Sequence, residues 1–458
     1  MDKANEDAVY YDKFEDLRDK FDDLRAFSRK IDRKWKPSRN LAEEKRNKVI
    51  VCHDMKGGYL QEDMSSEFEL KVNDPNPFVY AFWWYTDIFI YFSHHFITVP
   101  TVRWINEAHD HDVLCLGTFI TEFDDGKVKC DEIFGSLINV DELVRHLVDL
   151  CLEWHFDGWL INIENEIKPE HIPNVIYFLE QLRNKLKSNI GEHSLLIWYD
   201  SITNEGKLAW QNCLNEKNNT FAQRCDGLFT NYTWNRRHLK VTKKFVEENK
   251  TQLSTYDIYF GVDVFGRGAF EGGGFNTYKA VQAARNYEFS SAIFAPGWTS
   301  ECFGPGTFSL VNHYKLFSQM IDIVHPHRVK NDFKTKMTYG FQNGRFNPNH
   351  REIQPFLLES DDVKLTENGI EIGGKKDSKH VIYLTDILNV KDYQLSTSND
   401  QLLPKATTET YKEGHSDKCK ITEIYVVKAT DDPVILTDLD FTVQYDIKKE
   451  YLSYDIVP

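Results

Sequence analysis

The chain has 458 residues, of which 41% are hydrophobic and 14% aromatic, so it is too long for one hydrophobic core and too apolar to be disordered. Asp and Glu outnumber Lys and Arg by 71 to 55, and the resulting net charge of −16 argues against nucleic acid and anionic membranes as partners. The acidic N-terminus lacks a secretory signal and no apolar run reaches the roughly 20 residues of a membrane helix, so we expect a cytoplasmic protein.

Residues 1–46 form a charged segment with a helical repeat of apolar residues. These residues, spaced by three and four, are Phe14, Leu17, Phe21, Leu24, Phe27 and Ile31. The spacing predicts an amphipathic helix. Because the repeat covers fewer than three heptads, docking of the helix on the main domain is favoured over a coiled coil.

From residue 48 onward, short apolar runs alternate with helical stretches, a pattern typical of βα units around a parallel sheet. The predicted strands are 49–52, 88–92, 113–119, 158–163, 195–199, 227–231, 258–262 and 292–295. The predicted helices are 100–109, 141–153, 172–186, 239–248, 276–287 and 311–323, with irregular first and fifth connections. The fold class is therefore α/β, and eight strands within residues 47–328 predict a (β/α)8 TIM barrel with its catalytic groups after the strands.

Residues 329–458 show no helical period. Alternating apolar and polar residues occur at 369–372, 381–387, 421–428 and 441–447, separated by turn signals. We expect an all-β module, with a sandwich as its architecture. Structural packing is its predicted role, and glycan binding is the alternative.

The strand predicted at 158–163 leads into an amide and a carboxylate. Asn162 and Glu164 fall on the same face, about 7 Å apart, and the face is apolar below them. Asp157 has the opposite parity and is expected to be structural. Asn165 and Glu166 follow in the loop and are the nearest competitors for the role of acid.

Polar and aromatic side chains follow the other strands as well. They include His94, Glu122, Tyr199, Trp210, Asn231, Trp234, Asp263, Arg267 and Trp298. A cleft lined by rings and hydrogen-bonding groups points to a saccharide. The glycine-rich stretch 268–274 lacks the cation of a phosphate site, and we expect a mobile loop there. The eight cysteines follow no metal-binding spacing, so reduced thiols, no metal and no cofactor are expected.

One strand tip with one carboxylate and one amide predicts a particular mechanism. Retaining glycosidases normally use two carboxylates about 5 Å apart. Here the nucleophile would come from the substrate, because the carbonyl oxygen of a 2-acetamido sugar can attack C1 to give an oxazolinium ion. Glu164 would protonate the leaving oxygen, and Asn162 would orient the acetamido group.

Several longer motifs resemble those of the cytosolic endo-β-N-acetylglucosaminidases, family 85 of the glycoside hydrolases. They are CHDM at 52–55 with GGY at 57–59, YFSHH at 91–95, LGTFITE at 116–122, FDGWLINIEN at 156–165, WYDS at 198–201, FTNY at 229–232 with Trp234, and GVDVFGRG at 261–268. The resemblance covers residues 47–325. It implies cleavage of the β-1,4 bond in the N,N′-diacetylchitobiose core of N-glycans, retention through an oxazoline, and transglycosylation.

The resemblance also implies roles for individual residues. Glu164 matches the family's acid/base, Asn162 its orienting amide, and Tyr199 a tyrosine near the reacting centre. Trp210 and Trp234 look like aromatic walls of the glycan cleft. The further residues expected to bind substrate are Asn231, His94, Asp263, Arg267 and Trp298. The expected substrates are N-glycans, glycopeptides or free oligosaccharides.

Two rival functions remain. A chitinase-like enzyme would read D-G-x-D-x-D-x-E along this strand, but Leu160 and Asn162 stand where that pattern has aspartates. A non-catalytic glycan-binding barrel is the other alternative, and the presence of Glu164 counts against it. The preference for high-mannose or complex glycans and the oligomeric state stay open.

Overall fold

The structure is a computed structural model. It describes residues 8–19, 37, 39–60, 63, 70–71, 78–303, 309–335, 341–342, 345–346, 362–366, 369–397, 406–413 and 419–445. The chain divides into two compact units, Met1–Pro326 and His327–Pro458.

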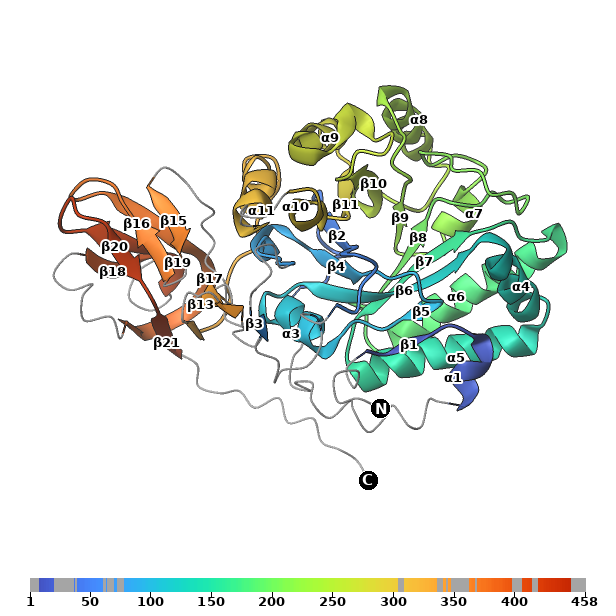
Figure 1. Ribbon diagram of the computed structural model, residues 1–458, viewed down its shortest axis with the longest axis horizontal. Coiled ribbons are helices and arrows are strands. Elements are labelled where there is room, and N and C mark those ends of the chain that lie inside the picture. Colours follow the sequence, from blue (N-terminus) through green and yellow to red (C-terminus); the bar gives the residue numbers. More distant parts are fainter. Residues whose placement is uncertain are drawn as a thin grey trace. The chain divides into compact units, whose positions relative to one another are not determined.

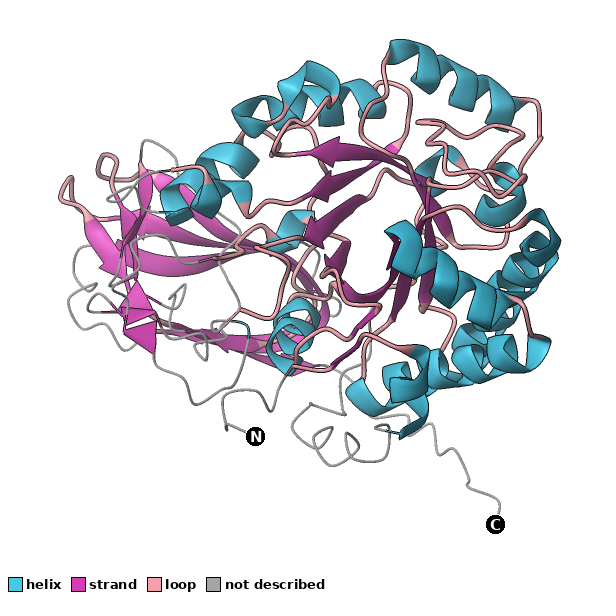
Figure 2. Cartoon of the chain, turned by 45° about the vertical axis from the view of Figure 1, so that its right-hand side comes forward, coloured by secondary structure: helices cyan, strands magenta, loops and turns pink. Residues whose placement is uncertain are grey.

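The first unit is built on a closed ring of eight parallel strands. In ring order these are β2 (Val49–His53), β4 (Ile88–Tyr91), β6 (Leu114–Glu122), β7 (Gly158–Glu164), β8 (Leu195–Tyr199), β9 (Gly227–Phe229), β10 (Ile258–Asp263) and β11 (Ser290–Phe294), which pairs with β2 again. Helices surround the ring (Figures 1 and 2). The prediction of a (β/α)8 barrel is confirmed, and each predicted strand is present.

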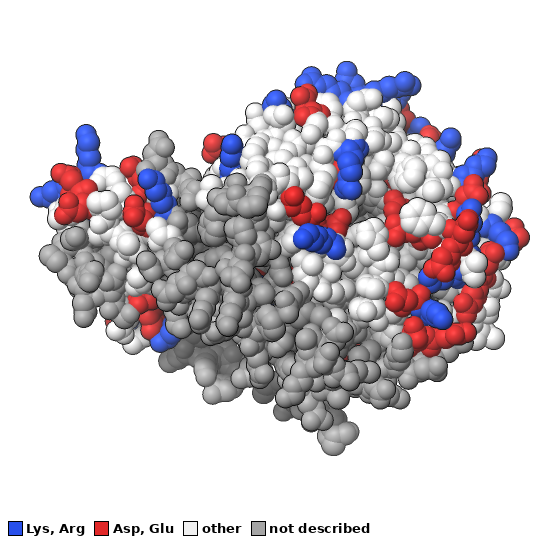
Figure 3. All heavy atoms as spheres, viewed as in Figure 1, with Lys and Arg blue, Asp and Glu red and all other residues white. Residues whose placement is uncertain are grey.

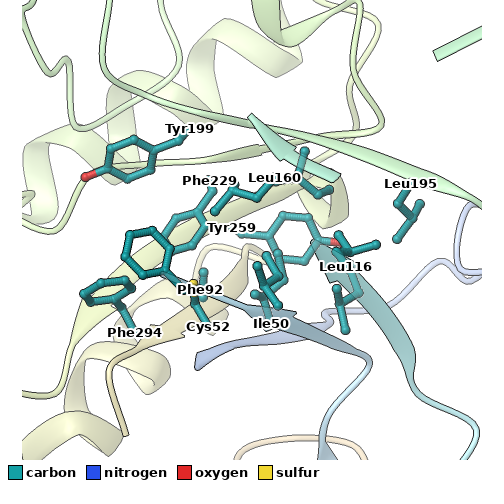
Figure 4. Close-up of a cluster of buried hydrophobic side chains, with 14 of the residues drawn as sticks. Ile50, Cys52, Phe92, Leu116, Leu160, Leu195, Tyr199, Phe229, Tyr259 and Phe294 are labelled. Carbon is teal, nitrogen blue, oxygen red and sulfur yellow. The ribbon is translucent and has the colours of Figure 1, made fainter. Parts of the chain in front are cut away.

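The strands read as apolar runs because both of their faces are covered. Every residue of β2 and of β8 is buried. Side chains pointing inward fill the barrel, from Leu195 and Leu116 at one end of the row in Figure 4 to Tyr199 and Phe294 at the other. A filled interior leaves only the ends of the barrel for a ligand.

The helices of this unit are α1 (Phe14–Asp19), α3 (Val102–Asp110), α4 (Phe123–Phe134), α5 (Leu137–Trp154), α6 (Ile172–Asn189), α7 (Asn219–Ala222), α8 (Arg236–Glu247), α9 (Thr277–Arg285), α10 (Trp298–Glu301) and α11 (Ser309–Ser318). The six predicted helices correspond to α3, α5, α6, α8, α9 and α11. Helix α4 was not predicted, and it follows β6 without a loop. Short 3-10 turns are η4 (Trp83–Tyr85), η5 (Pro169–His171), η6 (Thr255–Asp257), η7 (Phe270–Gly272) and η8 (Gly274–Asn276).

The first and fifth barrel connections are irregular, as expected. The described part of the first connection holds β3 (Leu70–Lys71) and η4, and the fifth holds the short α7. None of the helices within the described ranges combines the length and hydrophobicity needed to cross a bilayer.

The described part of the N-terminal segment lies against the barrel. Strand β1 (Tyr10–Tyr11) pairs antiparallel with β5 (Ile97–Thr98), which in turn pairs with β6. Phe14 and Leu17 of α1 are fully buried. The predicted continuation of this helix through Ile31 lies outside the described residues.

The described part of the second unit is all β, as predicted. One antiparallel sheet has the order β12 (Phe333–Thr335), β21 (Leu439–Tyr445), β17 (Lys379–Ser396), β19 (Cys419–Lys428), β18 (Ala406–Glu413). The other consists of β15 (Val363–Thr366), β16 (Gly369–Ile372) and β20 (Val434–Leu436), and β13 (Phe341–Gln342) pairs with β14 (Arg345–Phe346). The two sheets are linked where Lys428 Nζ donates to the Ile372 carbonyl at 3.2 Å.

Candidate active site

A cavity of about 220 Å³ opens at the carboxyl ends of the barrel strands. Its floor is apolar and largely aromatic, with Cys52, Phe92, Leu160, Phe229, Tyr232 and Phe294. Its polar rim consists of Asp54, His94, Glu122, Asn162, Glu164, Tyr199, Asp263 and Arg267. The sequence assigned a catalytic or substrate-binding role to ten residues. Six of them line this one cavity, namely His94, Asn162, Glu164, Tyr199, Asp263 and Arg267. An apolar floor with converging polar groups is the usual form of a small-ligand site.

Asn162 presents a buried acceptor at the tip of β7. The side chain is 5% exposed, and its Oδ1 accepts no hydrogen bond from any residue that the structure describes. Leaving such an atom without a partner costs about 1–3 kcal/mol. The arrangement thus favours a ligand that brings an N–H or O–H group to this point.

Glu164 lies two residues further along β7 and is largely buried. Burial and the charge of Glu122 raise its pKa above the ordinary value, while hydrogen bonds from Trp210 and Asn162 and the charge of His94 act in the opposite direction. The contact with Trp210 is a weak one, because the indole Nε1 lies 3.3 Å from Glu164 Oε1. A carboxyl group in this environment is suited to donate a proton.

Glu122 was noted in the sequence as a polar group after a strand, but no role was assigned to it. The parallel pairing of β6 with β7 sets Glu122 directly beside Glu164. Its Oε2 lies 3.0 Å from His94 Nδ1. This hydrogen bond is the main cause that raises the pKa of His94 above its ordinary value. The sequence did not reveal this role because β6 extends three residues beyond its predicted end. Only the register of this longer strand with β7 places Glu122 next to Glu164.

Tyr199 and Asn231 belong to a chain of hydrogen bonds that fixes the rim. The Tyr199 hydroxyl donates to Asn231 Oδ1 at 2.9 Å, and Asn231 Nδ2 donates to Asn212 Oδ1 at 3.0 Å. Asn212 adopts a left-handed conformation (φ 57°), and its amide donates to Asp200 at 2.6 Å. Burial raises the pKa of Asp200 to about 6. The network holds the loop that carries Trp210, whose side chain is 42% exposed.

Asp263 positions Arg267. The Arg267 guanidinium donates to both carboxylate oxygens, at 2.8 and 3.0 Å, and the amides of Phe265 and Arg267 donate to them as well. The guanidinium carbon lies 5.9 Å from the centre of the Phe294 ring on the floor. Asp263 is therefore saturated with donors, and Arg267 is the group of the pair that faces a ligand.

Trp234 and Trp298 do not line the cavity. Trp234 is 2% exposed, its indole donates to the Gly261 carbonyl at 2.6 Å, and its ring stacks on Phe270 with centroids 4.8 Å apart. Trp298 packs edge to face on Phe275 and Phe303. Both rings are occupied by packing, so their predicted contact with substrate has no support in this arrangement.

Asn165 and Glu166, the competitors for the acid role, also do not line the cavity. Asn165 is buried and donates to the Glu166 carbonyl at 3.0 Å, while the Glu166 side chain is 65% exposed, 3.9 Å from Lys127. The stretch 268–274 contains η7 and the first residue of η8, and the Gly274 amide donates to the Val264 carbonyl at 2.6 Å. Among the described residues, no cluster of three or more His, Cys, Asp or Glu side chains could hold a metal.

Comparison with known proteins places this chain in a family. Residues 59–351 match the profile described as Glycosyl hydrolase family 85. The cytosolic endo-beta-N-acetylglucosaminidase of Gallus gallus is 38% identical over 329 residues, which cover 69% of this chain and 44% of the relative. The protein of that name from Homo sapiens is 40% identical over 258 residues, 56% of this chain and 33% of the relative.

A solved structure gives the same fold at lower sequence similarity. The glycoside hydrolase domain of Endo-D from Streptococcus pneumoniae R6 aligns with a TM-score of 0.65 and 14% identity, covering 95% of this chain and 82% of that domain. The chain spans less than half the length of the two curated relatives named above. Because the family match covers more than half of the chain and includes the amide and carboxylate of β7, the chain belongs to glycosyl hydrolase family 85.

Proposed function

We propose that this chain hydrolyses the β-1,4 bond between the two GlcNAc residues in the core of N-glycans, by substrate-assisted retaining catalysis. Its substrates are N-glycans, either on glycopeptides or as free oligosaccharides. It acts in the cytosol, and this location is taken from its relatives, which are named cytosolic enzymes. The observation that carries the proposal is the pairing, on one face of β7, of a buried amide acceptor with a carboxyl group of raised pKa.

Asn162 acts on the acetamido group of the substrate. When the acetamido oxygen attacks C1, positive charge develops on the nitrogen, and its N–H becomes a stronger donor. The bond to Asn162 Oδ1 therefore strengthens on the way to the oxazolinium ion. An interaction that is stronger in the transition state than in the ground state is the kind that raises kcat.

Glu164 serves as acid and then as base. Its raised pKa keeps the proton available for the leaving oxygen. After the aglycone departs, the same carboxylate removes a proton from water, which opens the oxazolinium ring at C1 and restores the original configuration. A sugar hydroxyl in place of water gives transglycosylation.

Three other carboxylates of the rim, Asp54, Glu122 and Asp263, are candidates for a nucleophile of the enzyme's own. Asp54 accepts a hydrogen bond from the Gly57 amide at 3.1 Å. Asp263 is held by Arg267 and two amides, which leaves it poorly placed to attack. Glu122 is engaged by His94, and its charge acts on Glu164. We assign Glu122 the role of keeping Glu164 protonated, and the nucleophile remains the substrate.

Tyr199 stays neutral near the reacting centre, because burial and the charge of Glu164 raise its pKa well above the ordinary value. Because its proton is donated to Asn231 Oδ1, the neutral hydroxyl offers its oxygen as an acceptor for an O–H or N–H group of the substrate. His94, Asn231 and Arg267 bind sugar hydroxyls, and the exposed ring of Trp210 forms a wall of the cleft.

The test is to digest a defined N-glycopeptide and read the products by mass spectrometry. The expected products are a peptide with one GlcNAc and a glycan that ends in the other, with no effect of EDTA on the rate. Stepwise release of single GlcNAc units would favour the chitinase-like alternative. Binding without cleavage would favour a glycan-binding barrel.

A further inference from the structure

A second hollow lies directly beside the candidate catalytic cavity. It measures about 350 Å³, and its lining includes Asp12, Lys13, His94, Glu122, Phe123 and Lys129. His94 and Glu122, which are hydrogen-bonded to each other, line the catalytic cavity too, so the two spaces share this pair. The shared pair makes the second hollow a neighbouring site for a ligand held in the first.

One wall of the hollow comes from the N-terminal segment, which is firmly attached to the barrel. The Val99 amide donates to the Val9 carbonyl at 3.1 Å, and the Tyr10 ring stacks on His95 with centroids 3.5 Å apart. Asp12 Oδ1 lies 2.7 Å from His95 Nδ1. This wall precedes residues 59–351, so it is not part of the family match.

The lining also includes Phe123, which has two unusual properties. Its side chain is 78% exposed, and its φ of 55° puts a bulky residue in the left-handed region. Such a conformation is costly for a residue with a large side chain, and strain of this kind concentrates at functional sites. Phe123 follows Glu122 directly in the chain, and both residues line this hollow.

The charges of the hollow indicate what it binds. Asp12, Glu122 and Asp125 outnumber Lys13 and Lys129, and Lys129 is paired with Asp125. Acidic side chains gather, with some basic ones among them, on the surface around α4 in Figure 3. An anionic ligand is therefore disfavoured, whereas a ring face among donors and acceptors suits a neutral sugar.

We propose that this hollow binds a neutral branch sugar of the N-glycan, with Phe123 as its stacking platform and Lys13 as a hydrogen-bond donor. The assignment rests on the proposed function. It makes the N-terminal segment a determinant of which glycans are accepted.

The experiment compares two glycopeptides with the same peptide, one bearing a mannose-rich N-glycan and one trimmed to its trimannosyl core. Phe123→Ala should raise KM for the mannose-rich substrate by roughly 10-fold and leave the trimmed substrate unchanged. Phe123→Tyr keeps the ring and should restore the wild-type KM. Ile138→Ala, which also truncates an exposed apolar side chain, is the matched control.

Equal KM changes for the two substrates, or no change for either, would overturn the inference. The inference would also be overturned if the change in KM disappeared when the same glycan was offered without its peptide. Calorimetry tests the hollow without cleavage. It compares the affinity of the free mannose-rich oligosaccharide for Glu164→Gln with its affinity for the double variant that also carries Phe123→Ala. Failure of the wild-type chain to cleave either substrate would instead count against the proposed function.

Discussion

Strand β7 has a carboxylate at each end, and the two have opposite environments. At its base Asp157 accepts from the Cys115 amide at 2.8 Å, lies 2.8 Å from His109 Nε2, and is 3.4 Å from His193. Burial alone would raise the pKa of Asp157, but His109 and these other donors lower it below the ordinary value. At the tip, Glu164 has a 3.3 Å contact with Trp210 and a hydrogen bond from Asn162, and its pKa is raised.

The comparison shows that burial alone does not decide what a carboxylate does. Both groups are largely removed from water. Asp157 is surrounded by donors and stays ionised, whereas Glu164 has few donors and a neighbouring negative charge. The first arrangement stabilises a fold and the second keeps a proton ready for transfer.

The largest effect is expected for Glu164→Gln. Loss of the proton donor should reduce hydrolysis by about 10²- to 10⁴-fold or more, with unchanged thermal unfolding. Glu166→Gln removes an exposed carboxylate two residues further along and should change neither property. Near-normal hydrolysis by purified Glu164→Gln would move the acid role to another residue.

The opposite pattern is expected for Asp157→Ala. Removing this buried carboxylate deprives the Cys115 amide and His109 of an acceptor and should lower the free energy of unfolding by about 1–3 kcal/mol, measured by denaturant titration. Because the folded pKa of Asp157 is lowered, its contribution is present above the ordinary value of 3.8 and is lost as pH falls through the folded pKa. The loss of stability in acid should therefore be smaller in the variant. Unchanged stability at neutral pH would contradict the structural role.

A smaller effect is expected for Glu122→Gln. Removing this charge should lower the pKa of Glu164, so the alkaline limb of the pH profile of kcat/KM should move to lower pH. An unmoved limb would show that Glu122 does not act on Glu164. Loss of activity that azide restores would instead identify Glu122 as a nucleophile.

Much of the fold could be predicted, because parallel barrel strands are buried on both faces and leave apolar runs in the sequence. The position at which β6 ends was not predicted. Thr121 and Glu122 look like loop residues, yet the strand continues through them and α4 begins at once with Phe123. No capping residue or turn signal marks that junction.

The site was predictable where one strand carries it. The two-residue spacing of Asn162 and Glu164 follows from strand geometry alone. The contribution of Glu122 depends on the register between β6 and β7, which one sequence does not encode locally. The burial of Trp234 depends on Phe270, thirty-six residues later, and a tryptophan in a stacked core looks the same in sequence as one in a cleft.

The most direct test of substrate-assisted catalysis uses Asn162→Ala with two donors. With the natural glycopeptide, hydrolysis should fall by about 100-fold or more, because the amide that stabilises the forming oxazolinium ion is lost. With a preformed sugar oxazoline, transfer to a GlcNAc acceptor should persist, because the bond that Asn162 helps to form already exists and Glu164 still removes the acceptor's proton. If the folded variant lost both reactions equally, Asn162 would be a general binding residue and the substrate-assisted mechanism would be contradicted.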